Sequence, residues 1–366
     1  MAYGPDTDIL LRRLNEYVPL FQKQQREGFF MPPGVLSVSG LNVHSLPSLP
    51  ADLKEFHCNN SQLTSLPELP ESLEILSCYS SPLLSLPPLP RGLKELVCDT
   101  TRISSLPSLP PSLQNLHCRN IPTLIALPEL PGGLEYLECD VTAIESLPPL
   151  PSSLIRLSCT NTKIITLPEL PDSLDSLYFS GMYITTLPSS LTKLVISQSA
   201  ATSLPPLPSE LTTLMLTECR ITSIPTLPSN IEKIWCQDVP LVSLPELPSS
   251  LTTLHIGNTQ LTVLPELPPS LRLLQIVGSQ ITVLPELPRS LKTFIVYETP
   301  LLLQEKEGES ILEYNERWNE WKSKQRIQER TTVIEEDIIA TAWHPDRFEQ
   351  WCLDEQEKKE NEGLYA

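Results

Sequence analysis

The stretch Leu264-Pro-Glu-Leu-Pro-Pro-Ser-Leu271 is one copy of a unit that recurs along most of this chain. The unit reads LPxLPxSLxxLxCxxxxIxS, and its first Leu (Ile in one copy) occupies thirteen positions. Ten of the twelve spacings between these positions are 20 residues, one is 21 and one is 17. Chance does not give thirteen copies, so the period indicates a stack of similar structural units. The positions are Leu46, Leu66, Leu86, Leu106, Leu127, Leu147, Leu167, Leu187, Leu204, Ile224, Leu244, Leu264 and Leu284.

The LxxLxC half of each unit predicts one short β-strand. In the copy that begins at Leu53, the two-residue strand period turns Phe56 and Cys58 to one face and His57 and Asn59 to the other. Stacked units then form a parallel sheet with neighbouring strands ~4.8 Å apart. A single unit cannot cover its own apolar face, so its neighbours must cover it.

The LPxLP half predicts an extended return rather than a strand or a helix. Each proline removes a backbone N–H group and fixes φ, and the residue before it is driven to extended conformations. The expected result is a narrow, polyproline-like segment on the outer side.

The repeat resembles the short leucine-rich repeat of bacterial effector proteins, whose pattern is LPELPxSLxxLxxxxNxLxxLP. The resemblance implies an α/β repeat solenoid, namely a leucine-rich-repeat horseshoe with a parallel concave β-sheet, an extended polyproline-like convex side and helical caps at both ends. Family repeats often carry Asn after the strand, where this chain mostly has Ser or Thr, such as Ser61 and Thr101. We expect a ladder of hydroxyl groups to replace the Asn ladder.

The repeat pattern divides the chain into three regions. Residues 1–40 are expected to form an N-terminal helical cap and an entry strand, and residues 41–302 the solenoid of 13 repeats. Residues 303–366, with four of the five tryptophans, are expected to form a helical Trp-rich tail. Two segments of this tail, ERWNEWKSKQRIQER and AWHPDRFEQWCLDEQ, resemble the tails of leucine-rich-repeat proteins of large nucleocytoplasmic DNA viruses. The 17-residue unit is either a tolerated deletion or a local change of curvature.

Composition limits the classes of partner. A formal charge of −18 makes nucleic acid an unexpected partner. No apolar run approaches 18 residues, which argues against a membrane span. The start, MAYGPDTDILLRRLNEY, lacks the features of a Sec-type signal peptide, so we expect an intracellular protein. Oligomeric state is expected to be a monomer or weak self-association.

Seven of the nine cysteines occupy one inward strand position, which Ile, Leu, Val or Phe fills in other repeats. This substitution pattern indicates core packing, because buried Cys behaves as a small apolar residue. Cysteines 20 residues apart do not form the close pairs typical of zinc sites, so neither a metal nor a cofactor is expected. Cys58 and its neighbour His57 point to opposite faces and cannot form a site together. Reduced thiols also favour an intracellular location.

A remote alternative is a ubiquitin ligase that uses Cys352. Some effectors with this repeat carry a C-terminal ligase domain with a catalytic Cys-x-Asp motif, and Cys352-Leu-Asp354 matches it. That domain is several times longer than the 64-residue tail, and a three-letter match is expected by chance.

The outward strand positions are the expected binding surface, since aromatic residues and Arg carry much of the energy of protein interfaces. For Trp235 an alternative is that the ring leans over its neighbours. We therefore predict a non-catalytic protein–protein interaction module that binds another protein on the concave face as an intracellular adaptor or host-manipulating effector. A structural or virion-associated assembly protein is the alternative. The predicted partner-binding residues are Tyr136, Tyr178, Met215, Trp235, His117, Arg156 and His255.

Overall fold

The computed structural model describes residues 34–181, 184–282, 284–285, 287–288 and 290–300. They contain one parallel sheet of 14 strands in chain order, so each strand pairs with those of the adjacent repeats. The strands are β1 (Val35–Ser37), β2 (Glu55–His57), β3 (Ile75–Ser77), β4 (Glu95–Val97), β5 (Asn115–His117), β6 (Tyr136–Glu138), β7 (Arg156–Cys159), β8 (Ser176–Phe179), β9 (Lys193–Ser197), β10 (Thr213–Thr217), β11 (Lys233–Gln237), β12 (Thr253–Gly257), β13 (Leu273–Val277) and β14 (Thr293–Tyr297).

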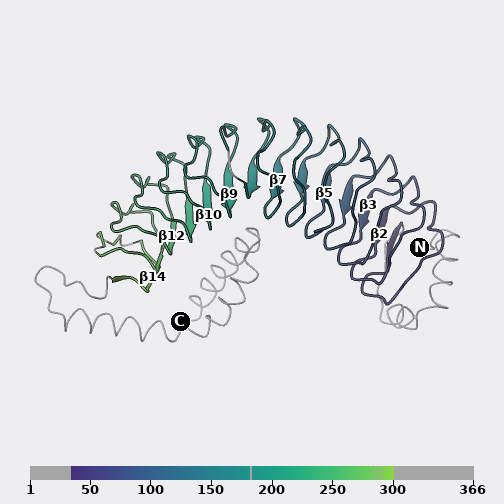
Figure 1. Cartoon of the computed structure of the whole chain (residues 1–366), viewed down its shortest axis with the longest axis horizontal. Coiled ribbons are helices and arrows are strands. Elements are labelled where there is room, and N and C mark those ends of the chain that lie inside the picture. The colour runs from purple at the N-terminus through teal and green to yellow at the C-terminus, as the bar shows by residue number, and fades with distance from the viewer. Residues whose placement is uncertain (1–33, 182–183, 283, 286, 289, 301–366) are drawn as a thin grey trace, which may run out of the picture. The chain divides into compact units, whose positions relative to one another are not determined.

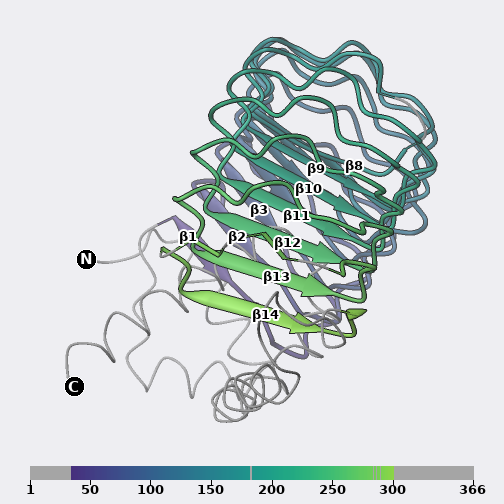
Figure 2. The ribbon, with the colours of Figure 1, turned by 90° about the vertical axis from the view of Figure 1, so that its left-hand side faces the viewer.

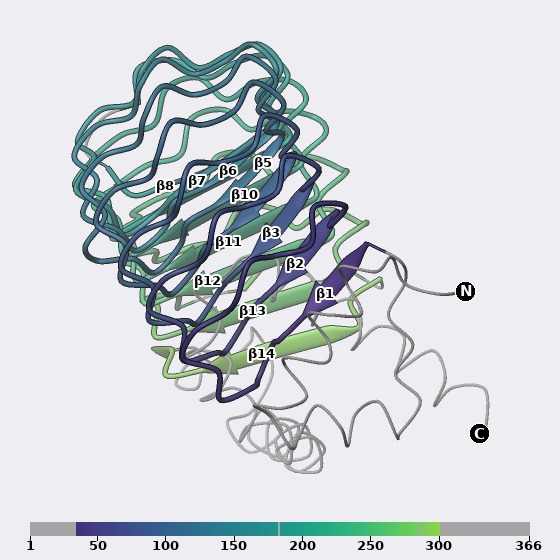
Figure 3. The same cartoon turned by 90° about the vertical axis from the view of Figure 1, so that its right-hand side faces the viewer.

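The solenoid with a parallel sheet is confirmed. Figure 1 shows the turns stacked in an arc with the strands on its inner side, and Figures 2 and 3 show the strands running in one direction. The expected entry strand is β1. The chain divides into two units, Met1–Glu298 and Thr299–Ala366, and the whole described sheet belongs to the first. The expected helical caps lie outside the described residues.

Strand register builds the core from columns of equivalent side chains. Leu36 pairs with Phe56, and Phe56 pairs with Leu76, and all three are almost completely buried. The cysteines from Cys58 to Cys159 form a second column and are 0% exposed. Core packing of these cysteines is therefore confirmed.

The predicted hydroxyl ladder is present over part of the stack. Ser81 Oγ donates to the carbonyl oxygen of Cys58 at 2.8 Å, and Thr101 and Thr142 donate to the carbonyls three residues before them at 2.9 and 2.8 Å. These bonds satisfy carbonyl groups where the chain leaves the strand. The equivalent Thr259 and Ser279 hydroxyls are buried without a hydrogen-bond partner among the described residues.

A second ladder explains the recurrent Ser of LPxSL. Ser72 Oγ donates to the carbonyl oxygen of Leu53 at 2.7 Å, and Ser112 does the same to Leu93. Ser153 and Ser270 repeat this contact at 2.6 and 2.7 Å with the leucine of the preceding repeat. The hydroxyl thus ties each return to its neighbour, a role that the repeat pattern by itself did not indicate.

Strands β1 to β7 and β9 to β14 are each followed by a residue in the left-handed region of backbone conformation. In most repeats this residue is not glycine: examples are Asn60 (φ 52°), Val141 (φ 56°) and Asn161 (φ 53°). Asn tolerates this conformation, whereas a β-branched residue such as Val is strained in it. Val141 is also 43% exposed, so its side chain gains little from packing in return.

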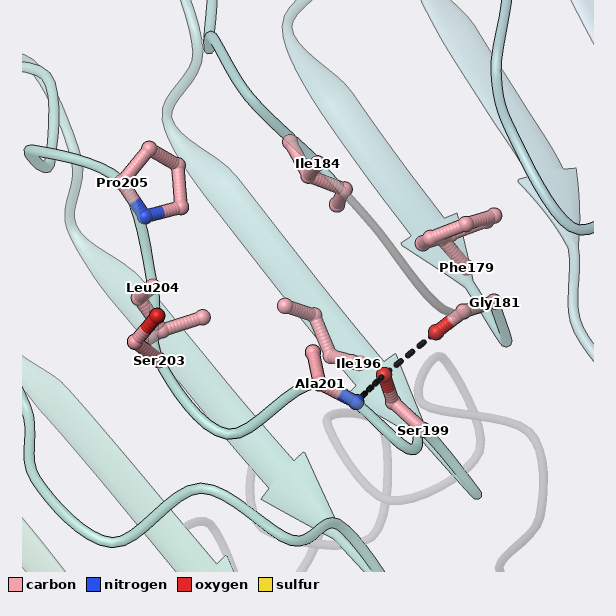
Figure 4. A pocket seen from close by; sticks show the side chains of 9 residues that line it. All are labelled: Phe179, Gly181, Ile184, Ile196, Ser199, Ala201, Ser203, Leu204 and Pro205. Atoms are coloured by element: carbon pink, nitrogen blue, oxygen red, sulfur yellow. Dashed lines mark hydrogen bonds between the residues drawn. The ribbon is translucent and has the colours of Figure 1, made fainter.

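The 17-residue repeat leaves a small cavity in the core. Ala201 stands where neighbouring repeats place a buried Ile or Leu, such as Ile221, and the space beside it is about 10 Å³. Figure 4 shows Ala201 facing this space together with Ile184, Ile196 and Leu204. Ser199, hydrogen-bonded to the carbonyl of Gly181 and to the Ala201 N–H, closes one side. The deletion is therefore accommodated without interruption of the sheet between β8 and β9.

We predict that Val141→Asn stabilises the protein by about 1 kcal/mol, because it relieves the left-handed strain of a β-branched residue. The matched variant Asn161→Val, one repeat further on, should lose a similar amount. Urea unfolding of both variants checks this prediction. Equal stability of Val141→Asn and wild type would contradict it.

Ala201→Val should also raise the free energy of unfolding, by about 1 kcal/mol, since it adds two apolar carbons beside the cavity. The control Ile221→Ala removes the equivalent side chain in the next repeat and should cost about 2–5 kcal/mol. Thermal unfolding followed by circular dichroism measures both changes. A lower melting temperature for Ala201→Val would show that the cavity cannot accept the added carbons.

Candidate functional site

Register brings together charged side chains that are 18 to 21 residues apart in the sequence. The outward positions of each repeat are those equivalent to Glu55, His57 and Asn59, and their side chains form three columns across the strands. Between β4 and β7 these columns contain one connected group, which we call the charged network. Its members are Asp99, His117, Arg119, Glu138 and Arg156.

Arg119 is held on one side by Asp99. Its Nε and Nη2 donate to Asp99 Oδ2 at 3.0 and 2.9 Å, and its backbone N–H donates to Asp99 Oδ1 at 2.7 Å. Three bonds to one carboxylate fix both the strand end and the plane of the guanidinium group.

Glu138 is the centre of the network. His117 Nδ1 lies 2.8 Å from Glu138 Oε2, and Arg119 Nη1 lies 3.2 Å from the same oxygen. Arg156 Nε lies 3.1 Å from Glu138 Oε1. His117 and Glu138 are paired in the sheet register because the extra residue of the 21-residue repeat falls after β5, before Leu124. One carboxylate therefore holds three nitrogen-bearing side chains from β5 to β7.

The network determines the protonation of its carboxylate. Burial raises the pKa of Glu138, but the hydrogen bond from His117 and the positive charges of His117, Arg119 and Arg156 outweigh burial and lower the pKa to about 2. Nearby Asp140 behaves differently, because burial raises its pKa in spite of hydrogen bonds from Ser158 and Thr160.

Tyr178 is flanked by two cations. The guanidinium carbon of Arg156 lies 4.5 Å from the centre of its ring, and Lys193 Nζ lies 5.4 Å from it. The expectation that Tyr178 is exposed is wrong: the side chain is 0% exposed, and its ring packs between residues of the two adjacent strands.

Trp235 leans over its neighbour, as the alternative interpretation held. Its ring stacks on His255 with centroids 3.5 Å apart and planes 7° apart. His255 Nε2 lies 3.0 Å from Gln237 Oε1, and burial lowers the pKa of His255 to about 4, so the ring is neutral at physiological pH. The expected exposure of His255 is thus also wrong.

The other predicted site residues remain accessible to different degrees. Tyr136 is 37% exposed and lies beside Arg156 in the sheet register, and Met215 and Trp235 are half-buried. Asp99, Arg119 and Glu138 were not among the predicted site residues. Opposite charges at equivalent positions of adjacent repeats were the signal that could have identified them. Whether any of these residues binds a partner stays a prediction.

The cysteine thiols of the described repeats lie in the core behind this face. Burial raises the pKa of Cys98, Cys118, Cys139 and Cys159, so these thiols stay protonated. Within the described ranges, no three His, Cys, Asp or Glu side chains are arranged to hold a metal ion, and no helix is long and apolar enough to cross a membrane. Cys352 lies outside the described residues.

One short strand per 20-residue unit, backed by columns of leucine, defines a leucine-rich-repeat solenoid. Among solved structures, the chain is similar to YopM from Yersinia enterocolitica WA-314, with 33% identity and a TM-score of 0.68 over 73% of this chain and 61% of that one. It is also similar to YopM of Yersinia pestis, described as a leucine-rich effector protein, with 30% identity and a TM-score of 0.65 over 82% of this chain and 90% of that one. The chain therefore belongs to the short-repeat leucine-rich-repeat family that includes YopM.

A third structure is similar in fold alone. The functional domain of InlJ from Listeria monocytogenes, described as including a cysteine ladder, has 24% identity and a TM-score of 0.53 over 68% of this chain and 64% of that one. No model of a protein family and no curated protein matches the sequence.

We predict that Glu138→Gln destabilises the protein at neutral pH by about 2 kcal/mol, because it removes the buried carboxylate charge that pairs with His117 and Arg156 and one of the two that pair with Arg119. The folded-state pKa of Glu138 is depressed, so its contribution is present above pH 4.5 and is lost as pH falls towards 2. The difference between variant and wild type should therefore shrink across this window. Urea unfolding at a series of pH values measures it.

Glu74→Gln is the control for this prediction. Ion pairs with Lys54 and Lys94 also lower the pKa of Glu74 to about 2, but this group lies at the surface. Its effect should be small and should disappear in high salt, whereas that of Glu138→Gln should persist. Equal salt sensitivity of the two variants would contradict the importance of burial.

Proposed function

We propose that this protein is a non-catalytic protein-binding module, an intracellular adaptor or host-manipulating effector whose partner binds the concave face. The observation that carries the proposal is the charged network beside Tyr136. It presents rigid polar side chains and an exposed aromatic ring on the largest regular surface of the solenoid. Interfaces draw much of their affinity from such aromatic and Arg groups.

Similarity to YopM supports the effector role. The protein from Yersinia pestis carries the description of an effector, and the present chain covers 90% of it. The chain spans 61% of the other YopM, and the two sequences are 33% identical. Recognition surfaces vary on a common fold, so the partner of this chain is a matter for experiment.

The state of the cysteines supports an intracellular location. All eight cysteines within the described ranges are buried and unpaired. Proteins of oxidising compartments generally form disulfides, whereas reduced cysteines are usual in the cytosol.

The test is capture of partners from a host-cell lysate by the full-length protein. We expect at least one protein to be retained by wild type and lost with Tyr136→Ala, since truncation of an interface aromatic commonly costs about 2 kcal/mol. Ile165→Ala is the matched control, because Ile165 is 56% exposed but lies outside the outward columns. Mass spectrometry identifies the proteins, and thermal unfolding verifies the fold of each variant. Identical sets of proteins for both variants and wild type would refute binding at this face.

A further inference from the structure

The return segments form a surface of their own, because they run along the outer side of the arc whereas the strands line its inner side (Figure 1). The eight consecutive returns from residues 106–114 to residues 244–252 contain eight Asp or Glu residues and no Lys or Arg. Arg156, which follows one of these returns, begins β7 and belongs to the charged network of the concave face. The outer surface of these repeats is therefore acidic, without cations on the returns themselves.

One groove opens on this outer surface between the returns at residues 147–155 and 167–175. Its volume is about 580 Å³, which is within the range of roughly 300–1,000 Å³ typical of ligand pockets. The walls are mainly apolar and include Leu150, Leu170 and Pro171, all of which are only half-buried. The groove thus exposes leucine and proline side chains that another apolar group can cover.

Hydrogen bonds fix the two walls in place before any ligand arrives. Ser153 Oγ donates to the carbonyl oxygen of Leu134 at 2.6 Å, and Ser173 Oγ donates to that of Leu154 at 2.6 Å. Each return is therefore tied to the repeat before it, and its prolines fix φ along the wall. A groove held in this way loses little conformational entropy on binding.

Two exposed carboxylates, those of Glu169 and Asp172, lie among the residues that line the groove. Neither has a hydrogen-bond or ion-pair partner within the part of the chain that the structure describes. Residues 145–155 and 163–175 together contain four Asp or Glu residues and one cation, Lys163. The apolar groove therefore lies in a negatively charged surrounding, which a ligand with positive charge beside an apolar group complements.

We propose that this groove binds a basic peptide segment of a partner protein, with an apolar side chain against Leu150 and Leu170 and an adjacent Lys or Arg at Glu169 and Asp172. Charge complementarity favours encounter with such a segment and disfavours an acidic segment or a nucleic acid. This surface is separate from the concave face, so the proposed function and this inference can fail independently.

The test uses the full-length protein and the fluorescein-labelled hexapeptide Leu-Arg-Leu-Arg-Leu-Arg. A Ser-Arg hexapeptide keeps the charge without the apolar side chains, and a Leu-Gln hexapeptide keeps the apolar side chains without the charge. Fluorescence anisotropy at low ionic strength measures binding, and increasing salt should weaken it. We expect the Leu-Arg peptide to bind more tightly than either comparison peptide, and spermine to compete for its site only weakly.

Pairs of equivalent residues in two repeats test the location. Glu169→Lys should weaken binding of the Leu-Arg peptide roughly tenfold. Glu246→Lys changes the net charge equally at the equivalent exposed position outside the groove, and should weaken binding less than about twofold. Leu170→Ala should weaken binding roughly fivefold, whereas Leu247→Ala, at the equivalent half-buried position, should have little effect. Thermal unfolding verifies the fold of each variant.

Equal weakening by Glu169→Lys and Glu246→Lys would overturn the inference, because general acidity rather than the groove would then hold the peptide. Binding of the Ser-Arg peptide or of spermine as tight as that of the Leu-Arg peptide would also overturn it, as would no measurable binding of the Leu-Arg peptide. Tyr136→Ala should leave peptide binding unchanged, and weaker binding of this variant would place the peptide on the concave face instead.

Discussion

Each repeat depends on its neighbours for the hydrogen bonds of its backbone as well as for cover of its apolar face, and this dependence fixes the register of the whole stack. Strand N–H groups bond the next repeat, as Cys58 does to Ser77 and Cys98 to His117. The hydroxyl of Ser112 ties a return to the repeat before it. A shift of one residue would break these bonds together and turn each leucine column outward.

The same register creates the charged network. Two residues at equivalent positions of adjacent repeats lie side by side on the sheet, so Asp99 meets Arg119 across 20 residues. The longer repeat would bring the wrong residue opposite His117 if its extra residue entered a strand. The chain places that residue before Leu124, outside the strands, and Glu138 stays in register. The pairing of His117 with Glu138 thus depends on the position of the extra residue within the repeat.

The repeat period by itself predicted the parallel sheet, the inward cysteines and the outward columns that contain Tyr136 and Trp235. Alternation of side chains along a strand is enough for these. It did not predict the burial of Tyr178 and His255, because alternation fixes the face to which a side chain points but not what packs against it. Nor did it predict the left-handed conformation of residues such as Val141. Val rarely adopts this conformation, which the turn after the strand requires here.

Within the charged network, the carboxylates and the guanidinium groups are exposed to different degrees. The carboxylates of Asp99 and Glu138 are less exposed than the guanidinium groups of Arg119 and Arg156, which they position through ion pairs. The pKa of Glu138 is lowered to about 2, so its carboxylate stays ionised over the physiological pH range. Because each pair joins adjacent repeats, the network depends on the stack: whatever preserves register between β4 and β7 also preserves these ion pairs.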